Sequence, residues 1–242
     1  MIGVVLAAGS GRRLLPHTEV LPKTLLPVDG DRTILDVILA NLAAAGLTDI
    51  AVVVGHAGQA IHARRQELER DHGVRLELVA NPRIDWNNAY SLWLARNHYA
   101  GGALLVNGDT VHPAEIETTL LANRGAGVHL AVDTVKDLTD EAMKVRLDAS
   151  GRLVTITKAM PPDEADGEYI GATLVEADVA ADLTECLAHT WKHHPDRYYE
   201  DGFQLLADRT GAVRATAIGT VAWVEVDDLY DLSRARELAC HC

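Results

Sequence analysis

The chain has 242 residues, of which 48% are hydrophobic and 24% are charged, and this balance excludes an intrinsically disordered protein. Its 22 basic and 35 acidic side chains give a formal net charge of -13. That surplus of acid argues against duplex nucleic acid and anionic membrane surfaces as partners, because both need a basic footprint. Phosphate-bearing substrates fit such a chain only where local basic residues or metal ions meet them.

The N-terminal segment, residues 2–7, is apolar and predicts a buried strand. It lacks the basic region of a signal peptide, and no apolar run approaches the roughly 20 residues of a membrane span. Three cysteines without framework spacing fit a reducing compartment, so we expect a cytoplasmic protein. The tail Cys240-His241-Cys242 could bind a soft metal, but further ligands at zinc-finger spacing are missing.

Strand-like and helix-like segments alternate through the first half of the chain. Apolar runs and helical spacing predict strands at 2–7, 50–54, 75–79 and 103–107, and helices at 33–45, 57–71 and 88–98. Strands without polar alternation, separated by helices, are typical of a parallel sheet that is covered on both faces.

The second half changes character at residues 144–158, where two alternating strands flank the turn Asp148-Ala149-Ser150-Gly151 and predict a hairpin. Further predicted elements are a strand at 169–175, helices at 177–189 and 197–209, one or two strands within 213–226, and a helix at 228–239. No repeat, linker or composition break divides the chain. We therefore expect one α/β domain over residues 1–242, with a mostly parallel central sheet, helices on both faces and a small β-hairpin insertion.

A glycine loop follows the first predicted strand, with the sequence Ala7-Ala8-Gly9-Ser10-Gly11-Arg12-Arg13-Leu14. Glycines at the carboxyl end of a parallel strand let backbone N–H groups approach an anion. The loop matches neither the dinucleotide fingerprint nor a Walker A motif. However, the first 23 residues contain three basic residues, Arg12, Arg13 and Lys23, and only one acidic residue, Glu19. This local positive charge in an acidic chain indicates a polyphosphate site.

The loop and the following Leu21-Pro22-Lys23-Thr24-Leu25-Leu26-Pro27-Val28 together resemble the signature of the nucleotidyltransferases. These enzymes join a nucleoside triphosphate to a phosphorylated small molecule, and the resemblance implies a Rossmann-like domain. It also implies that Arg13 contacts the phosphates, that Lys23 stabilises the α-phosphate, and that the triphosphate is wrapped by Leu6, Ala7, Ala8, Gly9, Ser10, Gly11 and Arg12. Such a transfer needs positioning and charge neutralisation more than covalent help. Two departures are the insertion-like segment 16–20 and Arg12, where a small residue is common.

Asp109 and Asp227 are candidate metal ligands, because each follows a predicted strand. From the residues alone, Asp109 could equally be a turn former, and Asp227 or Asp228 could be the N-cap of the last helix. In the resembled family, Asn107-Gly108-Asp109 and Glu225-Val226-Asp227 match the motifs whose aspartates hold Mg²⁺. Mg²⁺ prefers one or two carboxylates together with phosphate oxygens and water. The expected catalytic set is therefore Lys23, Arg13, Asp109 and Asp227, with Glu225 a weaker candidate ligand.

The stretch 81–92 indicates which branch of the nucleotidyltransferases the chain resembles. From the residues alone it is a polar loop that ends at a helix capped by Asn87 or Asn88. Its Asn81-Pro82 and Asn87-Asn88-Ala89-Tyr90-Ser91-Leu92 are similar to the compact bacterial cytidylyltransferases that act on phosphocholine, inositol 1-phosphate or 2-aminoethylphosphonate. The resemblance implies that the nucleotide also contacts Asn81, Asn88, Ser91 and Asn107.

The acceptor site is expected around the hairpin and the start of the helix at 197–209. Lys144 and Lys158 could each neutralise an acceptor phosphate or be a solvated lysine. The acidic residues at the helix start are favoured by its dipole, but an aromatic face and a carboxylate would also suit a cationic acceptor group, and a neutral polyol could hydrogen-bond the same carboxylates. The expected acceptor-binding residues are Lys144, Lys158, Tyr169, Gly171, Tyr199, Glu200 and Asp201.

The sequence thus predicts an enzyme that transfers CMP from CTP to a small phosphorylated or phosphonate acceptor, with Mg²⁺ as cofactor and pyrophosphate as product. One alternative is a sugar-1-phosphate nucleotidyltransferase that uses UTP, dTTP or GTP. Another is a non-catalytic nucleotide-sensing module, against which the intact set of Arg13, Lys23, Asp109 and Asp227 argues. The sequence does not identify the acceptor, and it leaves the oligomeric state open, a homodimer included.

Overall fold

A computed structural model describes residues 1–240, so His241 and Cys242 of the C-terminal tail, with any metal role of that tail, lie outside the described residues. The strands are β1 Ile2–Ala7, β2 Pro27–Asp29, β3 Arg32–Thr33, β4 Asp49–Val54, β5 Arg75–Ala80, β6 Ala103–Asn107, β7 Thr110–Val111, β8 Val128–Asp133, β9 Lys144–Leu147, β10 Leu153–Thr157, β11 Gly167–Val175, β12 Val213–Ala217 and β13 Val224–Glu225. The α-helices are α1 Ile34–Ala44, α2 Gln59–His72, α3 Asn88–Leu94, α4 Arg96–Tyr99, α5 Glu115–Ala122, α6 Ala180–His193, α7 Tyr199–Thr210 and α8 Leu229–Ala239. Short 3₁₀ turns cover Arg12–Leu14, Lys23–Leu25, Pro162–Glu164 and Ala177–Val179.

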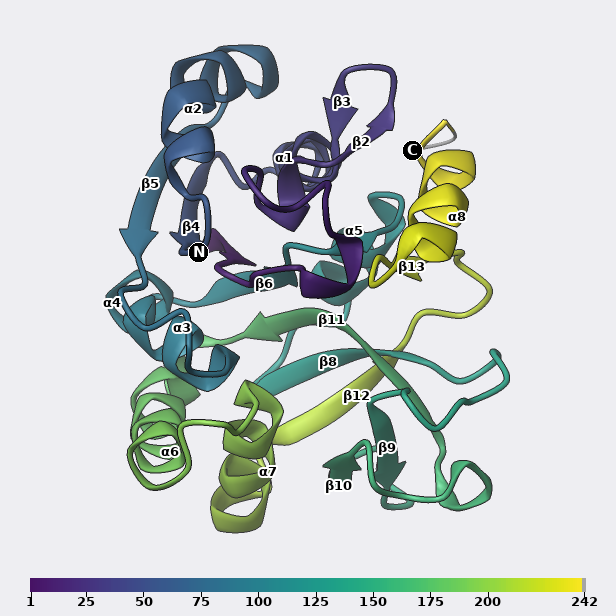
Figure 1. The fold of residues 1–242 in the computed structure, drawn as a ribbon. Helices are drawn as coiled ribbons and strands as arrows, with labels where there is room; N and C mark the ends of the chain where they lie inside the picture. The colour runs from purple at the N-terminus through teal and green to yellow at the C-terminus, as the bar shows by residue number, and fades with distance from the viewer. Residues whose placement is uncertain (241–242) are drawn as a thin grey trace.

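The central sheet has the strand order β10-β9-β11-β6-β1-β4-β5, and β8 joins it beside β11 and carries β12 (Figure 1). β1 pairs in parallel with β4 and β6, and β8 pairs in parallel with β12. β11 is antiparallel to β6, β8 and β9, and β10 is antiparallel to β9. All strands of this sheet except β10 and β11 therefore point the same way. The predicted mostly parallel sheet is confirmed.

Helices cover both faces of the sheet because alternate strand residues point to opposite sides. Val4 of β1 is buried in a core with residues of α3, α6 and α7, whereas Val5 is buried in a second core with residues of α1, α2 and α8. Figure 1 shows α1, α2 and α8 above the sheet and α6 and α7 below it. A strand that is covered on both faces needs apolar residues at every position, and this explains the unbroken apolar runs in the sequence.

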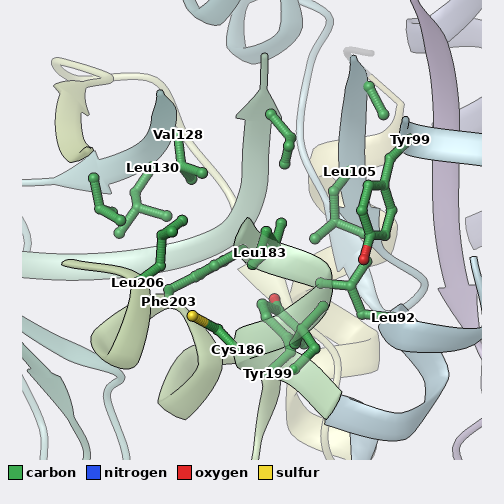
Figure 2. Packing of buried hydrophobic residues seen from close by; sticks show 14 of the residues in the cluster. Leu92, Tyr99, Leu105, Val128, Leu130, Leu183, Cys186, Tyr199, Phe203 and Leu206 are labelled. Atoms are coloured by element: carbon green, nitrogen blue, oxygen red, sulfur yellow. The ribbon is translucent and has the colours of Figure 1, made fainter. Parts of the chain in front are cut away.

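The lower core holds α6 and α7 together. Figure 2 shows Leu183 and Cys186 of α6 close to Phe203 and Leu206 of α7, and all four side chains are buried. Cys186 therefore serves as a small apolar core residue. This packing fixes the N-terminal end of α7, which contributes to the site described below.

Most predicted elements are present within a few residues of their expected ends, and the hairpin insertion is β9 and β10. In its turn, the Asp148 carboxylate accepts hydrogen bonds from the backbone N–H groups of Ser150 (2.8 Å) and Arg152 (2.9 Å). The predicted helix at 88–98 is two helices, α3 and α4. The sequence analysis missed α5, β8 and the short strands β2, β3 and β7. None of the described helices has the length and apolar character needed to cross a membrane.

Candidate functional site

The carboxyl ends of β1 and β6 bring two distant segments to one edge of the sheet. Leu6 of β1 pairs with Asn107 of β6, so the glycine loop and Asp109 leave the sheet side by side. Gly108 makes this approach possible, because a Cβ there would lie 2.6 Å from the carbonyl oxygen of Leu6. The N–H of Val226 donates to the Asp109 carbonyl (2.8 Å), and this bond brings Asp227 to the same edge.

A cluster of alternating charges occupies this edge, and we call Arg13, Lys23, Asp109 and Asp227 the charge cluster. Lys23 Nζ lies 2.8 Å from Asp109 Oδ2 and 3.0 Å from Asp227 Oδ1. A guanidinium nitrogen of Arg13 lies 2.8 Å from Asp227 Oδ2. Burial opposes the charge of Lys23, but the two carboxylates outweigh it and raise the pKa of the ammonium above its usual value. The lysine is therefore a permanent cation at this edge.

Three carboxylates lie close enough to share a metal ion. Ligand atoms of Asp109, Glu225 and Asp227 all lie within 4.8 Å of one another. Asp109 Oδ1 is buried and has no hydrogen-bond partner among the described residues, which suits an oxygen that accepts a cation. Glu225 is an exposed residue, but desolvation of its carboxyl group together with the charges of Asp109 and Asp227 raises its pKa to about 7. This acidic cluster could bind a divalent metal.

The structure separates the roles of Asp227 and Asp228, which the sequence left open. Asp228 Oδ1 accepts from the backbone N–H groups of Tyr230 (2.8 Å) and Asp231 (3.0 Å), so Asp228 is the N-cap of α8. Burial would raise the pKa of Asp227, but Lys23 and Arg13 hold it below its usual value. Asp227 is thus an ionised carboxylate that faces the cluster.

The glycine loop lines a hollow of about 480 Å³, which we call the loop hollow. The loop residues at its wall are Gly9, Ser10, Gly11, Arg12 and Arg13. The backbone N–H groups of residues 9–11 donate to no other described residue, and a Cβ on Gly9 would meet open space. Unpaired N–H groups beside two arginines and Lys23 form a setting that suits an anion.

A second hollow of about 260 Å³, the inner cavity, adjoins the loop hollow, and both are lined by Gly9, Arg13, Asn87 and Asp227. Its far wall contains Lys158, Tyr198 and Glu200 together with the apolar Met143 and Ile170. Glu200 is only 6% exposed, and its Oε2 has no partner among the described residues. Burial raises the pKa of Glu200 to about 8, and the negative charge of Glu225 adds to this effect.

A buried chain of hydroxyl groups supports the cavity from behind. Tyr169 shares a hydrogen bond with the hydroxyl of Tyr199 (3.0 Å), which donates to Asn107 Oδ1 (2.8 Å). Tyr169 and Asn107 line the cavity, but Tyr199 is fully buried behind them. Gly171, another lining residue, has φ +83°, and a Cβ there would lie 2.6 Å from Asn107 Nδ2. Only glycine leaves Asn107 in this place.

The start of α3 supplies the remaining wall. Asn87 is the N-cap of α3, and Asn88 Oδ1 accepts from the backbone N–H of Tyr199 (2.8 Å). Ser91 lines the inner cavity and accepts from Asn81 Nδ2 (2.9 Å). Asn81 itself lies behind Ser91, outside the lining of either hollow. Asn81 was expected to contact the nucleotide, but it supports the lining residue Ser91 and does not face the inner cavity itself.

Three expected acceptor-binding residues do not line the inner cavity. Lys144 is fully buried, and its Nζ donates to the backbone carbonyls of Thr139, Asp140 and Ala142 at 2.9–3.1 Å. These bonds use all three of its protons. Asp201 caps the start of α7 by accepting from the N–H of Tyr198 (3.0 Å) and from Arg197, so the dipole interpretation of this residue is the better one.

Tyr199 is the third expected acceptor-binding residue that does not line the inner cavity. Its side chain is directed into the core, and its neighbour Tyr198 lines the cavity instead. Lys158, Tyr169, Gly171 and Glu200 do line it. The sequence analysis also missed Asn87, Met143 and Ile170. Each lies within two residues of a predicted site residue, which is the only signal that could have found it.

The chain matches a known protein family. The family model described as Nucleotidyl transferase matches residues 2–141, more than half of the chain. The chain belongs to this family. The predicted resemblance is therefore confirmed, and the motifs around Gly9, Lys23 and Asp109 lie within the matched segment.

Two relatives show how far the similarity to known proteins extends. The chain is 27% identical over 236 residues to the "Bifunctional IPC transferase and DIPP synthase" of Aquifex aeolicus, covering 97% of this chain and 50% of that protein. It is 35% identical over 153 residues to the CMP-5'-(3-aminopropyl)phosphonate synthase of Streptomyces rubellomurinus, covering 62% of this chain and 23% of that protein. The chain thus spans half or less of these relatives. A glucose-1-phosphate thymidylyltransferase is also among the relatives.

Among solved structures, the inositol-1-phosphate CTP transferase from T. maritima has the same fold, with a TM-score of 0.84. The likeness covers 98% of this chain and 94% of that one, at 24% sequence identity. The likeness confirms the predicted Rossmann-like α/β fold of this chain.

Proposed function

We propose that this member of the family transfers CMP from CTP to a small phosphorylated or phosphonate acceptor and releases pyrophosphate. The observation that carries the proposal is the charge cluster, which lies where the loop hollow and the inner cavity meet. A triphosphate in the loop hollow would place its α-phosphate beside Lys23 and next to a cavity for the acceptor. Two adjoining hollows with cations at their junction suit group transfer between two bound molecules.

In the proposed reaction, an acceptor oxygen attacks the α-phosphorus in line. A new bond forms between that oxygen and the phosphorus, and the bond to the bridging oxygen of pyrophosphate breaks. Lys23 and Arg13 neutralise the charge that builds up on the phosphates, and the N–H groups of residues 9–11 orient them. A base is not needed, because an acceptor phosphate is already ionised near neutral pH.

The acidic cluster fits the Mg²⁺ that we propose as cofactor, because Asp109 and Asp227 offer two carboxylates and Asp109 Oδ1 lacks another partner. Glu225 lies within reach of the same site. When bound, Mg²⁺ would supply further charge neutralisation to the phosphates.

For the acceptor, we propose a molecule with a phosphate or phosphonate at one end and a cationic group at the other. Lys158 can meet the acidic group, and its Nζ lies 5.8 Å from the centroid of the Tyr198 ring, so both charged groups of a short acceptor would lie near this wall. The partly exposed Tyr198 ring and the unpartnered Glu200 carboxyl suit the ammonium group. The name of the Streptomyces relative, which includes an aminopropyl phosphonate, supports this choice.

A pyrophosphate-release screen tests the proposal. Purified protein with MgCl₂ is given CTP, UTP, dTTP or GTP, each with phosphocholine, 2-aminoethylphosphonate, inositol 1-phosphate or glucose 1-phosphate. We expect release with CTP and an amine-bearing acceptor, and none in excess EDTA. Lys23→Met serves as the matched inactive control. Release only with glucose 1-phosphate and another triphosphate would favour the second candidate, sugar-1-phosphate nucleotidyl transfer, to which the thymidylyltransferase relative points.

A further inference from the structure

The insertion-like segment 16–20 lies directly behind the glycine loop. Thr18 is fully buried, and its Oγ1 donates to the carbonyl of Gly11 (2.7 Å). That carbonyl also accepts from the N–H of Leu14 (2.9 Å). The methyl group of Thr18 packs against the same residue, since a Cβ built on Gly11 would lie only 2.9 Å from it. Thr18 thus holds Gly11 by a hydroxyl and a methyl at once.

Gly11 needs such a support. Its φ of +58° lies in the left-handed region, where glycine has no steric penalty but also little intrinsic preference over other conformations. The peptide groups on either side of Gly11 set the direction of the N–H groups that face the loop hollow. Two hydrogen bonds to its carbonyl select one of the conformations that the glycine could adopt.

His56, which follows β4, holds the segment 16–20 in turn. Its Nε2 lies 2.8 Å from the carbonyl oxygen of Thr18, and because a carbonyl only accepts, Nε2 carries the proton and donates. The backbone N–H of His56 donates to the carbonyl of Ala8 (3.2 Å). Gly55 lets the chains approach, since a Cβ there would lie 2.7 Å from the same Ala8 oxygen. One residue pair thus contacts the glycine loop at both of its ends.

We propose that His56 and Thr18 are positioning residues for the nucleotide site. They fix the conformation in which the N–H groups of residues 9–11 and the side chain of Arg13 face the loop hollow. This inference rests on the proposed function, in which the triphosphate binds there. Because the loop is ordered before the triphosphate arrives, less conformational entropy is lost on binding. Removing the Thr18 hydroxyl leaves the Gly11 carbonyl with one bond fewer and frees the loop.

Binding of CTP with MgCl₂ in the absence of acceptor, measured by calorimetry, tests the role of Thr18. Thr18→Val keeps the shape and removes the hydroxyl, whereas Thr18→Ser keeps the hydroxyl. We expect Thr18→Val to weaken CTP binding about tenfold, on the order of one buried hydrogen bond. Thr18→Ser should bind CTP within about twofold of the wild type, and the KM for the acceptor should stay unchanged in both variants.

The role of His56 is tested in the same assay. His56→Gln keeps an amide donor near the position of Nε2, and His56→Leu removes it. We expect the leucine variant to lose CTP affinity and the glutamine variant to recover most of it. His62→Leu, a change at an exposed histidine of α2, is the matched control and should bind CTP normally.

Two outcomes would overturn the inference: unchanged CTP affinity in Thr18→Val and His56→Leu with only a lower melting temperature, or equal losses in Thr18→Val and Thr18→Ser. Both refer to variants that keep the wild-type circular dichroism spectrum. Failure of the proposed function is distinguishable, because the wild-type protein itself would then bind no CTP, or would bind CTP without transferring CMP to any acceptor.

Discussion

Two adjacent aspartates at the start of α8 have different roles at the residue scale. Asp228 satisfies backbone N–H groups of the helix, and Asp227 is left to face Lys23 and Arg13. A sequence motif alone cannot separate them, because either could cap the helix. The hydrogen bonds of Asp228 therefore leave Asp227 as the carboxylate that faces the charge cluster.

Substitution of Asp228 should affect stability, whereas substitution of Asp227 should affect catalysis. We expect Asp228→Ala to lower the free energy of unfolding by about 1 kcal/mol, as loss of an N-cap does, with kcat little changed. Asp227→Asn should keep the fold and lower kcat at least a hundredfold, because it removes a charge from the proposed metal site. Denaturant unfolding and steady-state kinetics measure the two effects. A normal kcat in Asp227→Asn would contradict the assignment.

Glu200 gives a pH prediction. Burial raises its pKa to about 8, so its carboxyl group is neutral below that pH and becomes a carboxylate above it. A cationic acceptor is bound better by the carboxylate. We therefore expect the KM for phosphocholine to fall as the pH rises from 7 to 9, since its quaternary ammonium does not titrate. Kinetics over this range should show no such fall in Glu200→Gln. The same pH profile in both proteins would contradict the role of Glu200.

At the scale of elements, the parallel half of the sheet is readable from the sequence. The apolar runs that become β1, β4 and β6 are buried on both faces, and a short unbroken apolar run is typical of such a strand. The hairpin is readable because Asp148 and Gly151 supply turn chemistry. The members of the charge cluster could also be named from the sequence, because Arg13, Lys23 and Asp109 lie in motifs that resemble those of the nucleotidyltransferases.

What the sequence did not predict depends on tertiary context. β8 includes His129 and follows a glycine-containing segment, so it lacks an unbroken apolar run, and α5 is short and carries mixed polar and apolar residues. Lys144 does not line the inner cavity, because register decides whether a strand residue faces a cavity or the opposite side. Tyr198 lines the cavity and Tyr199 does not, because the direction of a side chain near a helix start depends on which residue is the cap.

The strand β11 contains an irregularity that shapes the cavity. Its register with β8 shifts between Tyr169 and Thr173, and Gly171 lies within this shift. Glycine at a positive φ is typical of a β-bulge that redirects neighbouring side chains. The bulge therefore links the main sheet to the positions of Tyr169 and Asn107.

Substitutions at Gly211 and Gly171 distinguish the cost of backbone strain from the cost of a collision with Asn107. Gly211→Ala, at φ +64° with open space around it, should cost roughly 1–2 kcal/mol of stability through left-handed strain alone. Gly171→Ala adds a collision with Asn107, so we expect a larger loss of stability and a raised KM for the acceptor. Thermal unfolding and kinetics compare the two. Equal stability losses with unchanged KM would contradict the role of Gly171.

At the scale of the whole molecule, a chain of charge -13 must bind a still more negative triphosphate. It concentrates Arg12, Arg13 and Lys23 at one sheet edge and holds three carboxylates there that could recruit a cation. Metal dependence of nucleotide binding is the expected consequence of this distribution.

Thermal unfolding measures that dependence. At a CTP concentration of 100 times Kd, the stabilisation is about 2.7 kcal/mol, which corresponds to roughly 5–10 °C in Tm for a chain of this size. We expect this shift with CTP and MgCl₂, and little shift with CTP and EDTA. Asp109→Asn should lose most of the Mg²⁺-dependent part. An equal shift in EDTA would contradict a metal-assisted site.

The central claim is the transfer of an intact CMP group between two bound substrates, and ³¹P NMR of the reaction tests it most directly. The sample contains the protein, CTP, MgCl₂ and a mixture of phosphocholine, 2-aminoethylphosphonate and inositol 1-phosphate. We predict that pyrophosphate and one CMP-linked acceptor appear in equal amounts while CTP is consumed. Pyrophosphate accompanied by free CMP, or CTP that remains unchanged, would contradict the account.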